Sequence, residues 1–264
     1  MVRQPAVAGT FYPASAKILR QTVEQLLKAS MASFEPARPK ALIVPHAGFV
    51  YSGPVAGQAY AQIIKHADII RRVVLLGPTH RVPVRGLALP TADRFATPLG
   101  EVAIDQDAIG RLAGMPQVVV NDAAHAREHS LEVQLPFLQR VLHEFTLVPL
   151  AVGNTTAVEV ADVLGTLWGG QETLIVISSD LSHYLPYAAA RQMDDDTVGR
   201  ILGGRLLDSV QQACGALPIN GLLLAASRHK LTPKLVSQCN SGDTAGDGQT
   251  VVGYAAIEFL ESHD

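Results

Sequence analysis

Residues 41–54 read ALIVPHAGFVYSGP, and this stretch sets the pattern from which the fold can be predicted. Its first part, residues 41–46, is an apolar run that ends in a histidine, which is typical of a buried strand. The Ser-Gly-Pro that follows is typical of a helix start, because proline is tolerated in the first turn, where no backbone N–H is required. The stretch therefore predicts a strand, a histidine-bearing loop and a helix that runs to about residue 67.

The same design recurs twice along the chain. Residues 71–80 (RRVVLLGPTH) and 173–184 (TLIVISSDLSHY) are again apolar runs that lead into loops with a histidine. Strands that alternate with helices predict a single α/β domain, with a mostly parallel or mixed sheet and helices on both faces. Residues 83–104, punctuated by Pro and Gly, predict short antiparallel strands instead.

The remaining elements follow from the same periodicities. Helices are expected at 105–113, 130–142, 157–168, 187–202, 205–214 and 220–230, and strands at 118–121, 145–152, 235–239 and 250–259.

The composition limits the classes of function. A hydrophobic fraction of 48% in 264 residues predicts one large core, and we expect a single domain over residues 1–264. A net charge of −3 without a Lys/Arg-rich block argues against nucleic-acid binding. Two cysteines do not make a disulfide scaffold, and they favour a reducing, cytoplasmic location. The sequence shows neither a signal peptide nor an apolar run of ~20 residues, so no membrane association is expected.

Three histidines follow the carboxyl ends of predicted strands. In α/β folds ligands bind in the crevice beyond these ends, so His46, His80 and His183 are expected to converge. One such histidine is more often an ordinary hydrogen-bonded loop residue, but three in equivalent places favour a site. The other histidines that receive no role are His66, His143, His229 and His263.

A thiolate is the second kind of candidate ligand. Cys239 lies at a strand-to-loop transition between polar neighbours, whereas Cys214 lies at a helix end and is interpreted as structural. Two imidazoles and a thiolate are typical of a mononuclear transition-metal site with open positions. The sequence therefore predicts one metal ion in the crevice.

Polar residues around this crevice are candidates for proton transfer and substrate contact. His183 is a candidate general acid or base. Asp180 either fixes the tautomer of that histidine or caps a helix that starts at Leu181. His125 and His129 are candidates either for supporting a metal ligand or for substrate contact, whereas Glu128 is interpreted as a helix-start residue.

Loop residues complete the predicted crevice. Tyr51 and Tyr184 are candidates for hydrogen bonds to a substrate, with ordinary packing as the alternative. The loop NSGDTAGDG (240–248) is interpreted as a wall of the crevice. Its Asp243 and Asp247 offer carboxylates but are also typical turn residues.

Seven motifs in a fixed order resemble the Memo family, whose prokaryotic members are called AmmeMemoRadiSam system protein B. They are RQPAVAGTFYP (3–13), VPHAGFVYSG (44–53), LLGPTH (75–80), EHSLEVQLPFL (128–138), SSDLSHY (178–184), CGALPI (214–219) and CNSGDT (239–244). The resemblance implies a fold similar to that of the class III extradiol dioxygenases, non-haem Fe(II) enzymes that open catechol rings with O₂.

The resemblance also implies roles for individual residues. His46 and His80 match the two metal-binding histidines, Cys239 the third ligand, His183 the acid/base and Asp180 a pocket aspartate. The dioxygenases carry a carboxylate where this chain has a cysteine, so ring cleavage is not implied.

Two alternative functions, from different classes of protein, are therefore expected. The first is an oxygenase or redox enzyme that uses Fe(II), with copper or zinc as alternatives, on a small molecule. The second is a non-catalytic protein that binds a metal, or a peptide in signalling, as eukaryotic members are thought to do. The family association also suggests AMMECR1-like and radical SAM proteins as partners.

Overall fold

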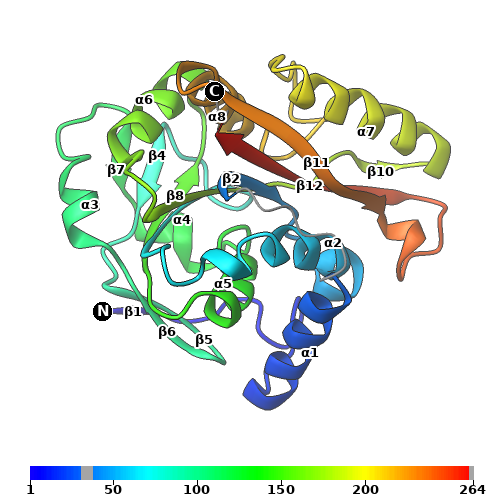
Figure 1. The fold of residues 1–264 in the computed structure, drawn as a ribbon, viewed down its shortest axis with the longest axis horizontal. Helices are drawn as coiled ribbons and strands as arrows, with labels where there is room; N and C mark the ends of the chain where they lie inside the picture. The colour runs from blue at the N-terminus through cyan, green and yellow to red at the C-terminus, as the bar shows by residue number, and fades with distance from the viewer. Residues whose placement is uncertain (31–37, 262–264) are drawn as a thin grey trace.

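The computed structural model describes residues 1–30 and 38–261. Within these residues the molecule is built around one mixed sheet of nine strands in the order β10-β12-β2-β9-β3-β8-β4-β7, with β11 paired to β12 (Figure 1). The strands of this sheet are β2 (Pro39–Val44), β3 (Arg72–Pro78), β4 (Leu87–Leu89), β7 (Val118–Val120), β8 (Thr146–Val152), β9 (Thr173–Ser178), β10 (His183–Leu185), β11 (Leu231–Asn240) and β12 (Val251–Glu261).

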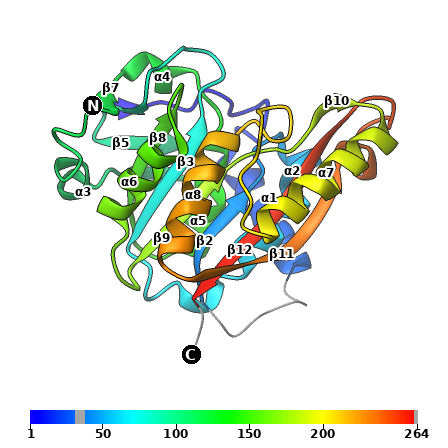
Figure 2. The same cartoon turned by 90° about the horizontal axis from the view of Figure 1, so that it is seen from above.

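Helices cover both faces of this sheet (Figures 1 and 2). The α-helices are α1 (Ala16–Ala29), α2 (Phe49–Ala61), α3 (Gln106–Gly110), α4 (Asp122–Ala126), α5 (Leu135–Val141), α6 (Ala157–Leu167), α7 (Tyr187–Leu202) and α8 (Ala216–Arg228). Short 3₁₀ turns are η1 (Ile64–His66), η2 (Glu132–Gln134) and η3 (Ser241–Asp243). A separate three-stranded sheet joins β1 (Val2–Arg3), β5 (Arg94–Thr97) and β6 (Gly100–Ala103).

The central strands explain why the apolar runs are continuous rather than alternating. In β2, Leu42 and Val44 belong to the core beneath α1, α2 and α5, whereas Ala41 and Ile43 belong to the core beneath α6 and α8. Because successive side chains of a strand point to opposite faces, a strand covered on both faces must be apolar throughout. The predicted α/β class, with a mixed sheet between two helical layers, is confirmed.

Several of the predicted helices differ from the structure. The helix predicted at 105–113 ends at Gly110, that at 130–142 is divided into η2 and α5, and that at 220–230 begins earlier, at Ala216. Residues 205–214 form irregular backbone and turns instead of a helix, and the backbone N–H and C=O of Leu207 pair with the side-chain amide of Asn220 on α8. Helix α2 begins earlier than predicted, at Phe49, so Pro54 lies inside it. The antiparallel strands predicted for residues 83–104 are confirmed, since β5 and β6 pair antiparallel there.

The sheet topology determines where the site forms. Strands β2, β9 and β3 are parallel neighbours, so the loops that follow them leave the same edge of the sheet. These loops carry His46, His80 and Asp180. This edge is therefore the crevice that the sequence predicts.

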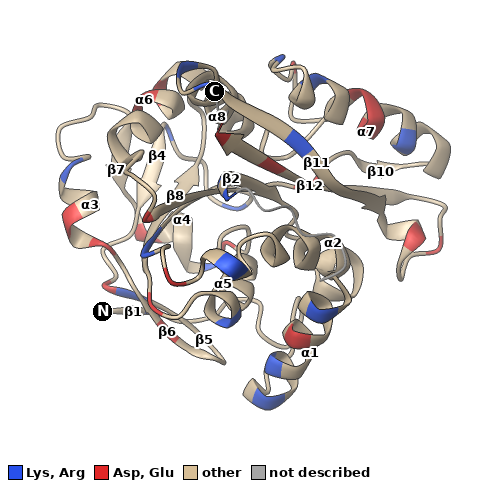
Figure 3. Cartoon of the chain, in the orientation of Figure 1, with Lys and Arg blue, Asp and Glu red and all other residues tan. Residues whose placement is uncertain are grey.

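Charged side chains are spread over several elements of the molecule. Lys and Arg lie on α1, α5 and α7 and on the strand β11 (Figure 3). Across residues 1–30 and 38–261, none of the helices combines the length and the apolar character that a membrane crossing requires.

Candidate metal centre

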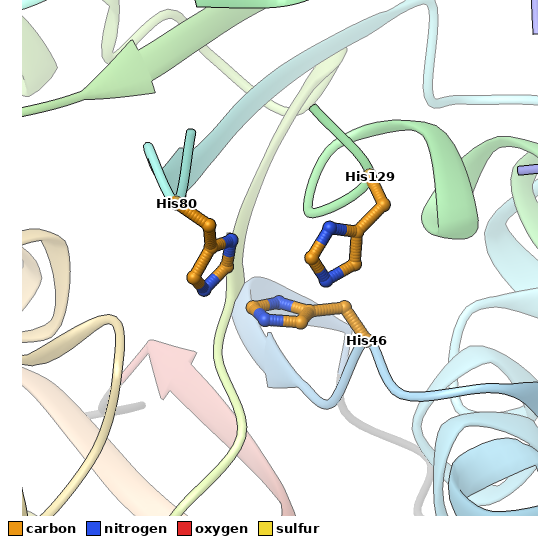
Figure 4. A group of neighbouring side chains, drawn as sticks. All are labelled: His46, His80 and His129. Carbon is orange, nitrogen blue, oxygen red and sulfur yellow. The ribbon is translucent and has the colours of Figure 1, made fainter. Parts of the chain in front are cut away.

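Three histidines meet at the carboxyl edge of the sheet. His46 follows β2, His80 follows β3 and His129 comes from the loop between α4 and η2 (Figure 4). One ring nitrogen of each lies within 4.8 Å of the corresponding nitrogens of the others. The ring centroids are 4.8–5.3 Å apart, so the rings share one small volume. We call these residues the three-histidine cluster.

Hydrogen bonds decide which nitrogen of His46 carries the proton. Ser178 Oγ donates to the carbonyl of Ser130, and it accepts from Gln134 Nε2 at 2.7 Å. Since the hydroxyl proton is already used, His46 Nδ1, at 2.9 Å from Ser178 Oγ, must be the donor of that contact. The lone pair of His46 is therefore on Nε2.

The amide of Gln134 is itself held in one orientation. Its Nε2 also donates to the carbonyl of Pro45 at 3.0 Å, and its Oε1 accepts from the hydroxyl of Tyr60 at 2.9 Å. Both residues are fully buried, so neither group has water as an alternative partner. The orientation of His46 thus depends on a hydrogen-bond chain that starts in the core beneath α2.

Glu128 holds the second histidine. Its Oε1 accepts from His80 Nδ1 at 2.9 Å and its Oε2 from the backbone N–H of His80 at 2.6 Å. Burial raises the pKa of this carboxyl, but the bonds and charge from His80 and the bond from the N–H of Ser130 outweigh it and hold the pKa at about 2. In neutral His80 the lone pair is therefore on Nε2, as in carboxylate–histidine–metal arrangements.

His129 is the third member and lies beside the same carboxylate. Its ring packs on Phe11, with centroids 4.7 Å apart. Its Nδ1 is 3.2 Å from Glu128 Oε1, but this buried nitrogen makes no hydrogen bond. Burial lowers the pKa of His129 to about 4. A buried polar atom without a partner in such a cluster is consistent with a site that takes a ligand.

The electrostatics of the cluster suit metal binding. Burial, followed by the neighbouring His129 and His80, holds the pKa of His46 well below its ordinary value. Neutral imidazole is the form that ligates a metal, and imidazole donors suit iron, copper, zinc and nickel. The residues present therefore fit a divalent transition-metal ion.

The cluster opens into a cavity of about 850 Å³. It is lined by the cluster itself and by Phe11, Ala47, Gly48, Tyr51, Asp180, His183, Tyr184, Ser241, Ala245, Gly246, Asp247, Thr250, Val252 and Tyr254. The predicted wall formed by the loop 240–248 is thus present, and Asp247 belongs to it. Asp243 is not among the lining residues; it accepts from the hydroxyl of Tyr187 at 2.6 Å.

His183 faces this cavity with a defined tautomer. Its Nδ1 is 2.9 Å from the carbonyl of Leu181, which can only accept, so Nδ1 carries the proton and Nε2 the lone pair. Burial lowers its pKa. The ring is therefore neutral and able to accept a proton near pH 7.

Asp180 takes neither of the two roles considered for it. No helix starts at Leu181, and the carbonyl of Leu181 rather than Asp180 fixes the tautomer of His183. Asp180 Oδ1 instead accepts from the backbone N–H of His46 at 2.7 Å. Burial raises the pKa of this carboxyl to about 7, although the bonds from the N–H groups of His46 and Ala47 oppose the rise.

Neither cysteine lines the cavity or belongs to the three-histidine cluster, although Cys214 lies close to His46. Cys239, on β11 opposite Tyr254, lines a separate hollow of about 140 Å³ together with Asp194 and Arg191. Cys214 Sγ lies 3.4 Å from His46 Nε2. The ligand set of His46, His80 and Cys239 stays a prediction; among the described residues, the cluster groups His129 with His46 and His80.

Burial keeps both thiols protonated near neutral pH. It raises the pKa of Cys239 to about 11, with a contribution from Asp243, and that of Cys214 to about 12, with a contribution from Asp180.

The other residues that the sequence offers for substrate contact divide into two groups, those that line the cavity and those that do not. Tyr51 and Tyr184 line the cavity, and Tyr184 is 75% exposed with a positive φ of 57°. His125 does not line it; this buried ring bonds the carbonyl of Ala88 through Nε2 at 2.9 Å. Of the histidines given no role, His66, His143 and His229 lie outside the cavity lining and His263 outside the described residues.

His125 predicts a pH dependence of stability. Burial lowers its pKa from 6.5 to about 4, so between these values the unfolded chain binds a proton that the folded chain does not. Stability is therefore lost as the pH falls from about 6.5 to about 4, by roughly 3 kcal/mol from this residue. In His125→Gln the amide keeps a donor for Ala88, and urea unfolding at stepped pH should show a shallower loss.

A matched control is His143→Gln, because His143 is an exposed histidine. We expect it to leave the slope between pH 4 and 6.5 unchanged. An equally shallow slope in both variants would refute the assignment to His125.

Sequence reasoning missed the role of Glu128. It was interpreted as a helix-start residue, whereas its carboxylate joins the loops of His80 and His129. One feature of the sequence points to this role: the glutamate stands directly before a histidine, in a loop that carries two histidines. Its bond to His80 spans 48 residues and requires the fold.

The fold and the site together define the class of protein to which the chain belongs. An uncharacterized protein of Escherichia coli K12 has a similar structure, with a TM-score of 0.54 and 14% identity over 83% of this chain and 99% of that chain. At this identity the likeness shows the fold alone, a single-domain α/β fold with a mixed sheet. In this chain the fold carries a three-histidine cluster that can hold a metal ion.

Sequence comparison shows the family. Residues 3–258 match the family described as Memo-like protein, and the chain belongs to that family. MEMO1 family proteins of Aquifex aeolicus and Methanosarcina barkeri are 38% and 36% identical to it, covering 98% and 97% of this chain and 99% of each relative. A MEMO1 family protein of Sulfolobus acidocaldarius is 33% identical over 98% of this chain and 99% of its own.

Proposed function

We propose that the chain binds one transition-metal ion through His46, His80 and His129 and acts as an oxygenase-type or redox enzyme on a small molecule in the adjacent cavity. The observation that carries the proposal is the convergence of three imidazoles, one of them bonded to a buried carboxylate, on a cavity of about 850 Å³. Fe(II) is the first candidate, with copper and zinc as alternatives, since imidazole suits all of them. When bound, such an ion supplies Lewis acidity and, for iron or copper, one-electron chemistry.

The residues around the cluster support proton transfer. His183 presents an unprotonated Nε2 and can take a proton from a hydroxyl group of the substrate. Asp180, with a pKa near 7, can hold a proton in the same cavity. The resemblance of the motifs to a family similar in fold to the class III extradiol dioxygenases supports the reaction class.

The lining of the cavity supports an aromatic substrate. Its aromatic side chains, Phe11, Tyr51, Tyr184 and Tyr254, offer surfaces on which a ring can pack. The volume lies within the range of roughly 300–1,000 Å³ that is usual for small-molecule sites.

The test begins with the metal. Protein purified without oxygen is analysed for metal, reconstituted with Fe(II), and mixed with a panel of catechols in an oxygen electrode. We expect a stoichiometric metal and oxygen uptake in the wild type, and retained metal without uptake in His183→Ala. A protein that binds neither Fe(II), copper nor zinc would refute the metal centre.

One observation favours a second, non-catalytic function. Val50 and Tyr184 are 68% and 75% exposed, and Tyr184 stands at the cavity, so apolar surface is available to a peptide. In that case the metal binds, no catechol consumes oxygen, and His183→Ala changes nothing. The AMMECR1-like and radical SAM proteins would then be the first partners to test.

A further inference from the structure

An N-terminal strap, residues 2–12, lies against the segment that carries His129. Its Arg3 is 8% exposed and packs over the ring of Phe95, with 5.3 Å between the guanidinium carbon and the ring centroid. An arginine so deeply buried requires partners for all of its donors. The structure supplies partners for four of its five N–H groups, all of them from residues 125–132.

The guanidinium of Arg3 holds the backbone next to the cluster. Nε and Nη2 each donate to the carbonyl of His125 at 3.0 Å, and Nη2 also donates to the carbonyl of Glu128 at 2.6 Å. Nη1 donates to the carboxylate of Glu132. Arg3 therefore holds the backbone on both sides of Glu128, the residue that orients His80.

Glu132 fastens the rest of the strap. It is fully buried and accepts from the backbone N–H groups of Ala6 at 2.7 Å and Val7 at 3.0 Å, and from the hydroxyl of Tyr12. The residue before Tyr12 is Phe11, whose ring packs on His129. The strap thus contacts the cluster at one end, through Phe11, and holds the backbone of Glu128 at the other, through Arg3.

We propose that Arg3 is a positioning residue for the metal-binding histidines. It acts through the backbone of Glu128, whose carboxylate accepts from His80 Nδ1 and from the N–H groups of His80 and His129. A planar fork is needed, because a single ammonium cannot serve two carbonyls and a carboxylate in one plane. The inference rests on the proposed metal site.

The test compares two matched substitutions, Arg3→Lys and Arg72→Lys. Arg72 also forms a partly buried ion pair, with Nε 2.6 Å from Asp105 Oδ2, but it lies at the start of β3, whereas His80 follows the end of that strand. Affinity for Zn²⁺ is measured by calorimetry and for Co²⁺ by its absorption spectrum. We expect Arg3→Lys to weaken both about tenfold, the lower end of what loss of an outer partner costs. Arg72→Lys should stay within about twofold of the wild type.

The outcomes separate this inference from the proposed function. A wild type that binds no Zn²⁺ or Co²⁺ overturns the metal centre and this inference with it. A wild type that binds both, with Arg3→Lys unchanged and folded by circular dichroism, overturns only the role of Arg3.

If Arg3→Lys does not fold, a second measurement, made on the wild type, tests the inference. Because coupling is reciprocal, a metal that binds more tightly when the strap is docked must also hold the strap in place. We expect saturating Zn²⁺ to slow hydrogen exchange of the Ala6 and Val7 amides about tenfold. The Ala108 amide, which donates to the distant carboxylate of Asp105, should not change. Unchanged exchange at Ala6 and Val7 would overturn the inference.

Discussion

His129→Ala is expected to abolish stoichiometric binding of Zn²⁺ or Fe(II), whereas Cys239→Ser is expected to bind as the wild type does. The first substitution removes one of the three imidazoles of the cluster, and the second alters a thiol that lines a different hollow. The loss should exceed the 10–100-fold that removal of an outer partner typically costs. Metal content after dialysis and titration calorimetry measure both variants.

This pair of variants decides between two ligand sets. Loss of metal in Cys239→Ser with retention in His129→Ala would support the set that the motifs imply, His46, His80 and Cys239. Thermal unfolding of the metal-free proteins controls for damage to the fold. His143→Ala, at an exposed histidine, controls for unspecific metal uptake by surface imidazoles.

Glu132→Ala is expected to lower the free energy of unfolding by roughly 3–5 kcal/mol. The carboxylate is fully buried and pairs with Arg3, so its removal leaves an uncompensated buried charge. It also leaves two backbone N–H groups and the hydroxyl of Tyr12 without their acceptor. Unfolding in urea with a constant m-value measures the loss.

The matched control is Glu24→Ala. Glu24 also pairs with an arginine, Arg140, at 2.6 Å, but its side chain is 48% exposed. Exposed pairs contribute about 0–1 kcal/mol, so this variant should remain close to the wild type. Equal losses in the two variants would show that burial of Glu132 is not what makes its ion pair important.

The parts of the fold that depend on local pattern were predictable from the sequence. Strand β9 lies within the predicted apolar run and the helix α7 has the predicted bounds, because each is set by its own periodicity and by a turn or proline at its end. The convergence of His46 and His80 also followed, since parallel strands end at one edge of the sheet.

The third member of the cluster depends on features that the sequence does not display. Strand β11 has a register shift between Leu235 and Ser237, and such a bulge changes the face to which later side chains point. Cys239 comes just after it. His129, in turn, lies in the cluster because the neighbouring Glu128 bonds to His80 and because Phe11 packs on the His129 ring, and both contacts join distant segments. Pairings of this range arise only when the strands are assembled.

The hydrogen-bond chain from Tyr60 through Gln134 and Ser178 to His46 has a consequence for evolution within the family. If the hydroxyl at position 178 is lost, the amide of Gln134 and the ring N–H of His46 both lose their acceptor inside the core. A substitution at one link is therefore tolerated only with a compensating change at the next. Positions 60, 134 and 178 should be inherited as a group, and a homologue that departs at one of them should depart at its neighbour in the chain.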